Sequence, residues 1–179
     1  HYSRFEAPVS SFKQNTLIFG DHFHPILMAL APLYWIWSAV EMLIVAQAAL
    51  VALSIVPVYL FTRRRLSFGT TVALCIAYAA SWELQRLVWF DFHELACAPL
   101  LVAIALDAID RRAWRTVWLC AMALMATKED LILFVAGIGV FIWAFHDRRH
   151  GVGLLLTSLV TFALVMFVVI PSFSPTGVW

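Results

Sequence analysis

Three short polar clusters interrupt an otherwise apolar chain, and each combines groups that can exchange protons or bind ions. They are Asp21-His22-Phe23-His24, Asp91-Phe92-His93-Glu94 and Lys128-Glu129-Asp130. Carboxylates and imidazoles serve as general acids and bases, and a lysine ammonium can receive a phosphate. Ionisable groups at the ends of apolar segments indicate a functional site in a membrane protein. The clusters are therefore the first candidates for chemistry.

Helix capping is the competing explanation for part of these clusters. Asp91 with Glu94, and Thr127 with Asp130, have the spacing of a capping box at a helix amino terminus. Capping explains Asp91 and Asp130 as well as catalysis does, but it leaves the histidines and Lys128 without a role. Lys128 either pairs with a neighbouring acid or receives an anion, and the sequence favours neither.

A divalent cation is a further reading of the acid and histidine side chains. Oxygen ligands with waters and phosphate would suit Mg²⁺ or Mn²⁺, and the possible ligands are Asp21, His24, His93 and Glu94. Their spacing matches no zinc pattern, and a structural role for each histidine stays open. The cysteines Cys75, Cys97 and Cys120 stand singly in apolar runs, which predicts buried thiols.

The elements that position these clusters follow from the arginines. Hydrophobic residues make up 63% of the chain and charged residues 13%, with a mean hydropathy of +0.89, which indicates a polytopic membrane protein. Arginine clusters at 63–65, 111–115 and 148–149 alternate with the polar clusters along the chain. Because arginine is retained on the cytoplasmic side, the acid and histidine clusters should face outward from the cytoplasmic membrane. Nucleic-acid binding has no support.

Apolar runs predict an all-α polytopic bundle of about six spans within a single transmembrane domain, 1–179, which we expect to be an internal piece of a longer chain. Four runs are short for a hydrocarbon core of roughly 30 Å, so the outer clusters should lie in a recessed, water-filled cavity. Charges at 128–130 would be costly inside one long helix, so we expect a break at Thr127. The predicted elements are an outer loop 1–25, an interfacial helix 26–37, and spans 40–61, 68–85, 95–109, 113–126, 128–146 and 151–170.

Other polar and small residues have structural interpretations. Gln47 should form a hydrogen bond between helices, and Pro57 should kink its span. Asp107, Asp110 and Asp147 stand beside arginines and should pair with them. Gly137 and Gly139 should permit close helix packing.

Several of these strings resemble a bacterial family of predicted membrane proteins, domain of unknown function 2079. They are Gly20-Asp21-His22-Phe23-His24-Pro25, Ala31-Pro32-Leu33-Tyr34-Trp35, Phe90-Asp91-Phe92-His93-Glu94, Ala98-Pro99, Lys128-Glu129-Asp130 and Val169-Ile170-Pro171-Ser172-Phe173-Ser174-Pro175. That family is similar to the GT-C superfamily of polytopic glycosyltransferases. The resemblance implies a GT-C-like fold, a polyprenyl-phosphate sugar donor among the membrane lipids, and a catalytic acid in the first outer loop, where Asp21 stands.

The leading hypothesis is therefore a GT-C-like glycosyltransferase with Asp21 as general base and Lys128 stabilising the departing phosphate. The alternatives are a transporter or lipid-handling protein with an outward acidic and histidine cavity, or a non-catalytic scaffold subunit. The remaining candidate residues would bind substrate: His22, His24, Arg86, Asp91, His93, Glu94, Glu129 and Asp130.

Overall fold

The computed structural model describes residues 9–10, 16–17 and 22–173, and nearly all of these are helical, which confirms the all-α class. A short antiparallel ladder joins β1 (Val9–Ser10) to β2 (Thr16–Leu17). The chain divides into two compact units. Unit 1 comprises His1–Ser38 and Met122–Trp179, and unit 2 comprises Ala39–Ala121.

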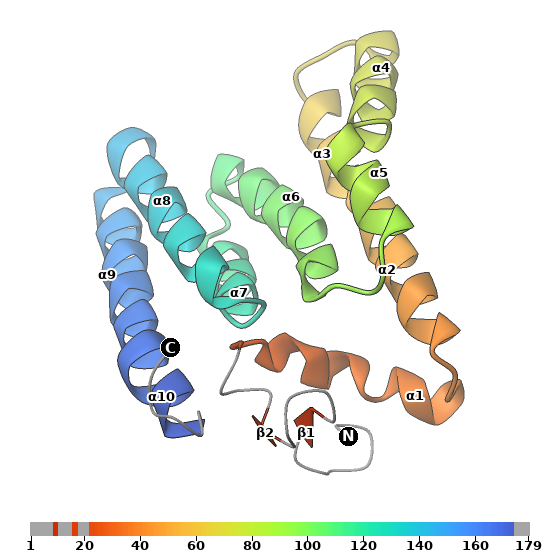
Figure 1. Ribbon diagram of the computed structural model, residues 1–179. Coiled ribbons are helices and arrows are strands. Elements are labelled where there is room, and N and C mark those ends of the chain that lie inside the picture. The colour runs from red at the N-terminus through yellow and green to blue at the C-terminus, as the bar shows by residue number, and fades with distance from the viewer. Residues whose placement is uncertain (1–8, 11–15, 18–21, 174–179) are drawn as a thin grey trace. The chain divides into compact units, whose positions relative to one another are not determined.

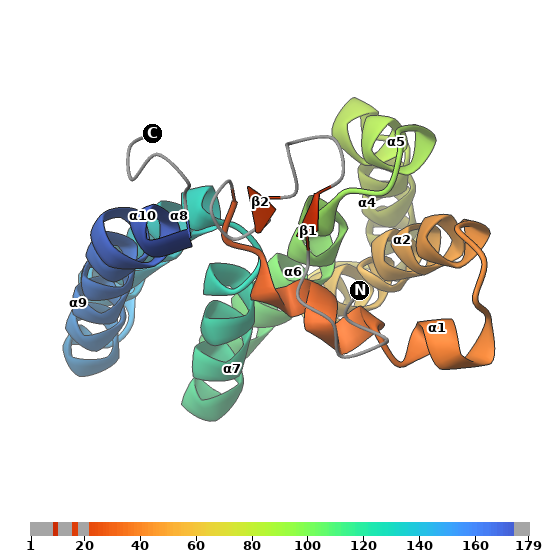
Figure 2. The same cartoon turned by 60° about the horizontal axis from the view of Figure 1, so that its bottom comes forward.

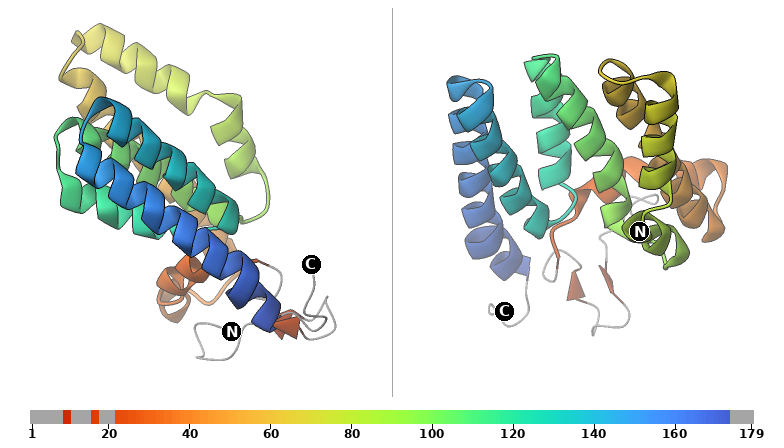
Figure 3. Two further views of the ribbon diagram at one scale, coloured as in Figure 1. Left: turned by 90° about the vertical axis from the view of Figure 1, so that its left-hand side faces the viewer. Right: turned by 90° about the horizontal axis from the view of Figure 1, so that it is seen from above.

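Unit 1 is built around a pair of antiparallel helices. Helix α8 (Glu129–Phe145) packs along α9 (Arg148–Leu164), as Figures 1 and 2 show in cyan and blue. Helix α9 continues through a π-helical turn, η5 (Val165–Val169), into α10 (Ile170–Phe173), and the three follow one axis in Figure 3. The predicted interfacial helix becomes two pieces, the 3-10 helix η3 (Pro25–Leu30) and α1 (Leu33–Ile36), with Pro25 at the first turn as expected.

Small residues allow α8 and α9 to approach closely. A Cβ at Gly151 would lie 2.2 Å from the backbone nitrogen of Trp143, and one at Gly139 would lie 2.7 Å from that of Leu155. Gly137 has no such neighbour within 4 Å. The packing role is thus confirmed for Gly139, wrong for Gly137, and shared by Gly151, which the sequence pattern did not single out.

Unit 2 contains α2 (Glu41–Leu53), α3 (Ile55–Arg63), α4 (Phe68–Ala79), α5 (Trp82–Trp89), the 3-10 turn η4 (Glu94–Ala96) and α6 (Cys97–Asp110). Helix α7 (Trp114–Met125) begins in unit 2 and ends in unit 1. Ser54 separates α2 from α3, since Pro57 has no N–H to bond the carbonyl of Leu53. The sequence predicts a kink at Pro57, and the structure has the break at Ser54, about one turn earlier in the chain.

Two helical stretches are long and apolar enough to cross a membrane, Glu41–Arg63 and Arg148–Phe173. They coincide with the predicted spans 40–61 and 151–170. The segment predicted as one span at 68–85 is divided between α4 and α5, which meet at an angle in Figure 3. Because α4 has 12 residues and α7 has 12, each is only about 18 Å long. The count of six spans therefore stays a prediction.

Many large apolar side chains lie on the surface of the described residues. Large apolar side chains such as Ile36, Trp89 and Phe167 are 79–91% exposed, as expected for a lipid-facing surface. Cys75, Cys97 and Cys120 are all buried thiols, which confirms that prediction.

Candidate functional site

The first and third polar clusters meet in unit 1. The Nδ1 atom of His22 lies 2.8 Å from Oε1 of Glu129, and the backbone N–H of Phe23 donates to Oε2 of the same carboxylate at 3.0 Å. The Ile26 N–H also donates to the carbonyl of Ala126 at 2.9 Å. The segment from His22 to Ile26 is consequently bound to the turn that leads into α8.

Burial divides the roles within this contact. The Glu129 side chain is 8% exposed, whereas the His22 side chain is 47% exposed. Glu129 is the first residue of α8, where the positive end of the helix macrodipole favours a carboxylate. Both of its oxygens are engaged, so Glu129 acts as an anchor, and His22 presents an accessible imidazole.

The turn before α8 differs from the predicted capping box. The helix break at residues 126–128 is confirmed, but Lys128 occupies the N-cap position, and its side chain does not cap the helix. The Thr127 hydroxyl instead donates back to the carbonyl of Ala123 at 2.9 Å. The capping box of Thr127 with Asp130 is therefore wrong, because the buried threonine satisfies the end of α7 instead. Asp130 is exposed in the first turn of α8.

Gln47 organises the second cluster in unit 2. Its buried side chain donates to the carbonyls of Leu87 at 2.7 Å and Phe90 at 3.1 Å, and it accepts from the His93 N–H at 2.8 Å. The prediction of an inter-helix hydrogen bond is confirmed and extended, because one amide holds both the end of α5 and the loop after it. The loop that carries Asp91, His93 and Glu94 is thereby fixed to α2.

His93, and not Asp91, caps the following turn. The Leu95 N–H donates to the imidazole Nδ1 of His93, and the Glu94 carboxylate lies 3.4 Å from the same nitrogen. The predicted capping box at Asp91 is wrong, since Asp91 lies two residues before the cap and is exposed. Arg86, in the last turn of α5, stacks over the ring of Trp82 at 5.5 Å.

The remaining candidates are placed as follows. His24 is buried at the start of η3. Asp21 lies outside the described residues. In the part of the chain that the structure describes, no three His, Cys, Asp or Glu side chains gather as a metal-binding group. Because Asp21 belongs to the expected ligand set, Mg²⁺ or Mn²⁺ binding stays a prediction.

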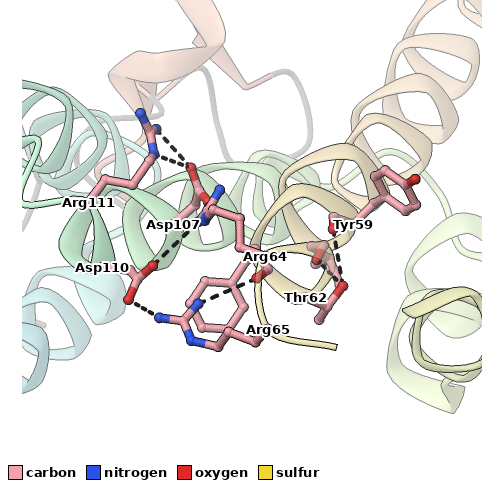
Figure 4. Close-up of polar contacts among 9 residues, drawn as sticks. Tyr59, Thr62, Arg64, Arg65, Asp107, Asp110 and Arg111 are labelled. Atoms are coloured by element: carbon pink, nitrogen blue, oxygen red, sulfur yellow. Dashed lines mark hydrogen bonds and ion pairs between the residues drawn. The ribbon is translucent and has the colours of Figure 1, made fainter. Parts of the chain in front are cut away.

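An ion-pair network joins two helix ends of unit 2, as Figure 4 shows. Arg64 and Arg111 both bind the buried carboxylate of Asp107, and Arg65 binds Asp110. The hydrogen bond from Arg65 holds the pKa of Asp110 below its usual value, and the bond to Asp107 raises the pKa of Arg64.

These contacts confirm the predicted arginine pairing of Asp107 and Asp110. Asp147 differs, since its side chain accepts from the His150 N–H at 2.9 Å and so caps α9.

Long apolar helices, apolar side chains on the surface and polar groups gathered at helix ends together define a helical membrane protein. The chain belongs to the family described as "Predicted membrane protein (DUF2079)", whose model matches residues 2–178. No curated protein and no solved structure matches the chain.

Proposed function

We propose that the protein is a GT-C-like membrane glycosyltransferase that takes a sugar from a polyprenyl-phosphate donor at the outer face of the cytoplasmic membrane. The observation that carries the proposal is the attachment of His22 and Phe23 to Glu129. It joins the segment that follows Asp21 to the amino terminus of α8, where Lys128 stands. A proton-accepting segment and a phosphate-binding helix end are the two parts that such a transfer requires.

In this reaction Asp21 takes a proton from the acceptor hydroxyl as that oxygen attacks the anomeric carbon. The bond between the anomeric carbon and the donor phosphate oxygen breaks, and the lipid phosphate leaves with the bonding electrons. Lys128 stabilises that phosphate, helped by the amino terminus of α8. Glu129 is a positioning residue, because both of its oxygens hold the His22–Phe23 segment. The exposed His22 and Asp130 line the substrate side.

The second cluster supplies the sugar pocket in this proposal. Asp91, His93 and Glu94 offer acceptors for sugar hydroxyls, and Arg86 offers a cation for the donor. Their loop is held by three hydrogen bonds to Gln47, which suits a binding site that must keep its geometry.

The test is sugar transfer by the full-length protein in membrane vesicles that contain radiolabelled polyprenyl-phosphate sugars. We expect Asp21→Asn to abolish transfer while expression and folding stay normal, and Lys128→Gln to reduce it by about 10²-fold. Glu41→Gln is the control, because that carboxylate begins α2 and lies outside the proposed site. Normal transfer by Asp21→Asn would refute the assignment. Proton-coupled solute uptake without any transfer by the unmodified protein would favour a transporter.

A further inference from the structure

Six exposed arginines gather at one end of unit 2, and we refer to them as the arginine surface. They are Arg63, Arg64, Arg65, Arg111, Arg112 and Arg115. Two carboxylates, those of Asp107 and Asp110, form ion pairs with arginines of this surface, as Figure 4 shows. Six positive charges less two negative charges leave four. The ion pairs therefore hold Arg64, Arg65 and Arg111 in place, and the arginine surface keeps a net positive charge.

Asp107 brings together guanidinium groups from two different turns. Arg64 follows α3 and Arg111 follows α6, yet both bind the same buried carboxylate. A carboxylate in the last turn of a helix is repelled by the negative end of the helix macrodipole. The charges of Arg64 and Arg111 offset this repulsion at Asp107. The result is a preorganised group of planar donors of the kind that binds phosphate.

The guanidinium groups of Arg112 and Arg115 are available to bind a ligand, among the residues that the structure describes. Neither side chain forms an ion pair or hydrogen bond with any residue that the structure describes. Arg112 also has a φ of 54°, a left-handed conformation that glycine adopts with less strain. Glycine would fit this backbone with less strain, and the arginine there adds one positive charge to the surface.

Apolar side chains flank the arginine surface. Leu60 is 49% exposed, Leu66 38% and Phe68 62%. A positive surface beside exposed apolar groups matches the boundary between lipid headgroups and acyl chains.

We propose that the arginine surface binds the phosphate headgroups of anionic phospholipids in the adjoining membrane leaflet, with Arg112 and Arg115 as direct ligands. The ion-paired Arg64, Arg65 and Arg111 provide the fixed positive field, and Arg112 and Arg115 complete the contact. This binding is independent of the glycosyl transfer proposed above.

The experiment measures lipid affinity by native mass spectrometry of the full-length protein, with phosphatidylglycerol and phosphatidylcholine as probes. The unmodified protein should prefer phosphatidylglycerol. Arg112→Gly and Arg115→Gln should each weaken that affinity about fivefold and leave phosphatidylcholine binding unchanged. Arg112→Lys, which keeps the charge, should retain most of the affinity. Equal affinity for the two lipids, or full affinity after both charge-removing substitutions, would overturn the proposal.

Two controls separate a built site from general effects. Arg149→Gln removes one positive charge from α9, in unit 1, and should leave the affinity unchanged; an equal loss there would mean that only net charge matters. Arg112→Gly should not lower the thermal midpoint, because glycine suits the backbone at this position. Inorganic phosphate at matched ionic strength should not displace the lipid, and displacement would assign the surface to a free anion.

Discussion

Replacing Gln47 by leucine should destabilise unit 2 more than any single exposed substitution on α2. The side chain is fully buried and takes part in three hydrogen bonds, with the Leu87 and Phe90 carbonyls and the His93 N–H. A buried polar group that loses its partner costs about 1–3 kcal/mol. We take the lower end for each of the three hydrogen bonds, because Leu87 and His93 are only partly buried and Phe90 is exposed, and expect a total loss of about 3 kcal/mol.

The assay is equilibrium unfolding of the purified protein in mixed micelles, followed by far-UV circular dichroism. Val45→Ala is the matched control, since Val45 lies two residues away on the same helix and is 54% exposed. Its effect should stay within about 0.5 kcal/mol. A loss below about 1 kcal/mol for Gln47→Leu would refute the reasoning.

Gln47→Glu gives a second and independent check. A carboxylate would still accept from the His93 N–H, but it would face two carbonyl oxygens that need a donor. We expect this variant to be less stable than Gln47→Leu at neutral pH and to recover when acid protonates the new side chain. Stability independent of pH would contradict the assigned contacts.

Three further predictions concern packing, the site and pH. Gly151→Ala should lower the unfolding free energy by about 1–3 kcal/mol because a Cβ would meet the Trp143 backbone, whereas Gly137→Ala should be neutral or stabilising. Glu129→Ala should speed hydrogen exchange at the Phe23 amide about tenfold, and a rate unchanged from wild type would contradict the anchor role. The hydrogen bond from Arg65 lowers the pKa of Asp110 in the folded protein. The ionised Asp110 should therefore stabilise the fold fully above the pKa that this carboxyl has in the unfolded chain, and this stabilisation should be lost as the pH falls through its pKa in the folded protein. The stability difference between wild type and Asp110→Asn should therefore shrink in acid titrations below about pH 4, and a constant difference would argue against that ion pair.

Local chemistry explains which site features the sequence could predict. Buried or partly buried polar groups need partners, so arginines near the same helix ends were the expected partners of Asp107 and Asp110. For the same reason a glutamine within an apolar run is expected to bond to backbone groups. Helix breaks at charged positions also follow from the cost of burying charge. The same cost explains why the three polar clusters lie between apolar runs and not within them.

The caps could not be predicted in the same way. Asp91 and Thr127 both have suitable side chains for a cap, yet His93 caps one turn, and Thr127 bonds back to Ala123. Several residues within one turn can satisfy the same backbone N–H, so spacing alone does not select among them. The choice depends on how the neighbouring helices constrain the turn.

The sequence by itself determined that this is a helical membrane protein with its polar groups at helix ends, because composition and charge placement limit what a chain can bury in a bilayer. Only the tertiary structure decided that Glu129 holds His22 and Phe23, and that Gly151 brings α9 against α8. These partners lie far apart in the chain, and residue type alone does not select between several chemically acceptable long-range contacts. Packing makes that selection, since each buried group accepts the partner that the approaching helices bring within reach.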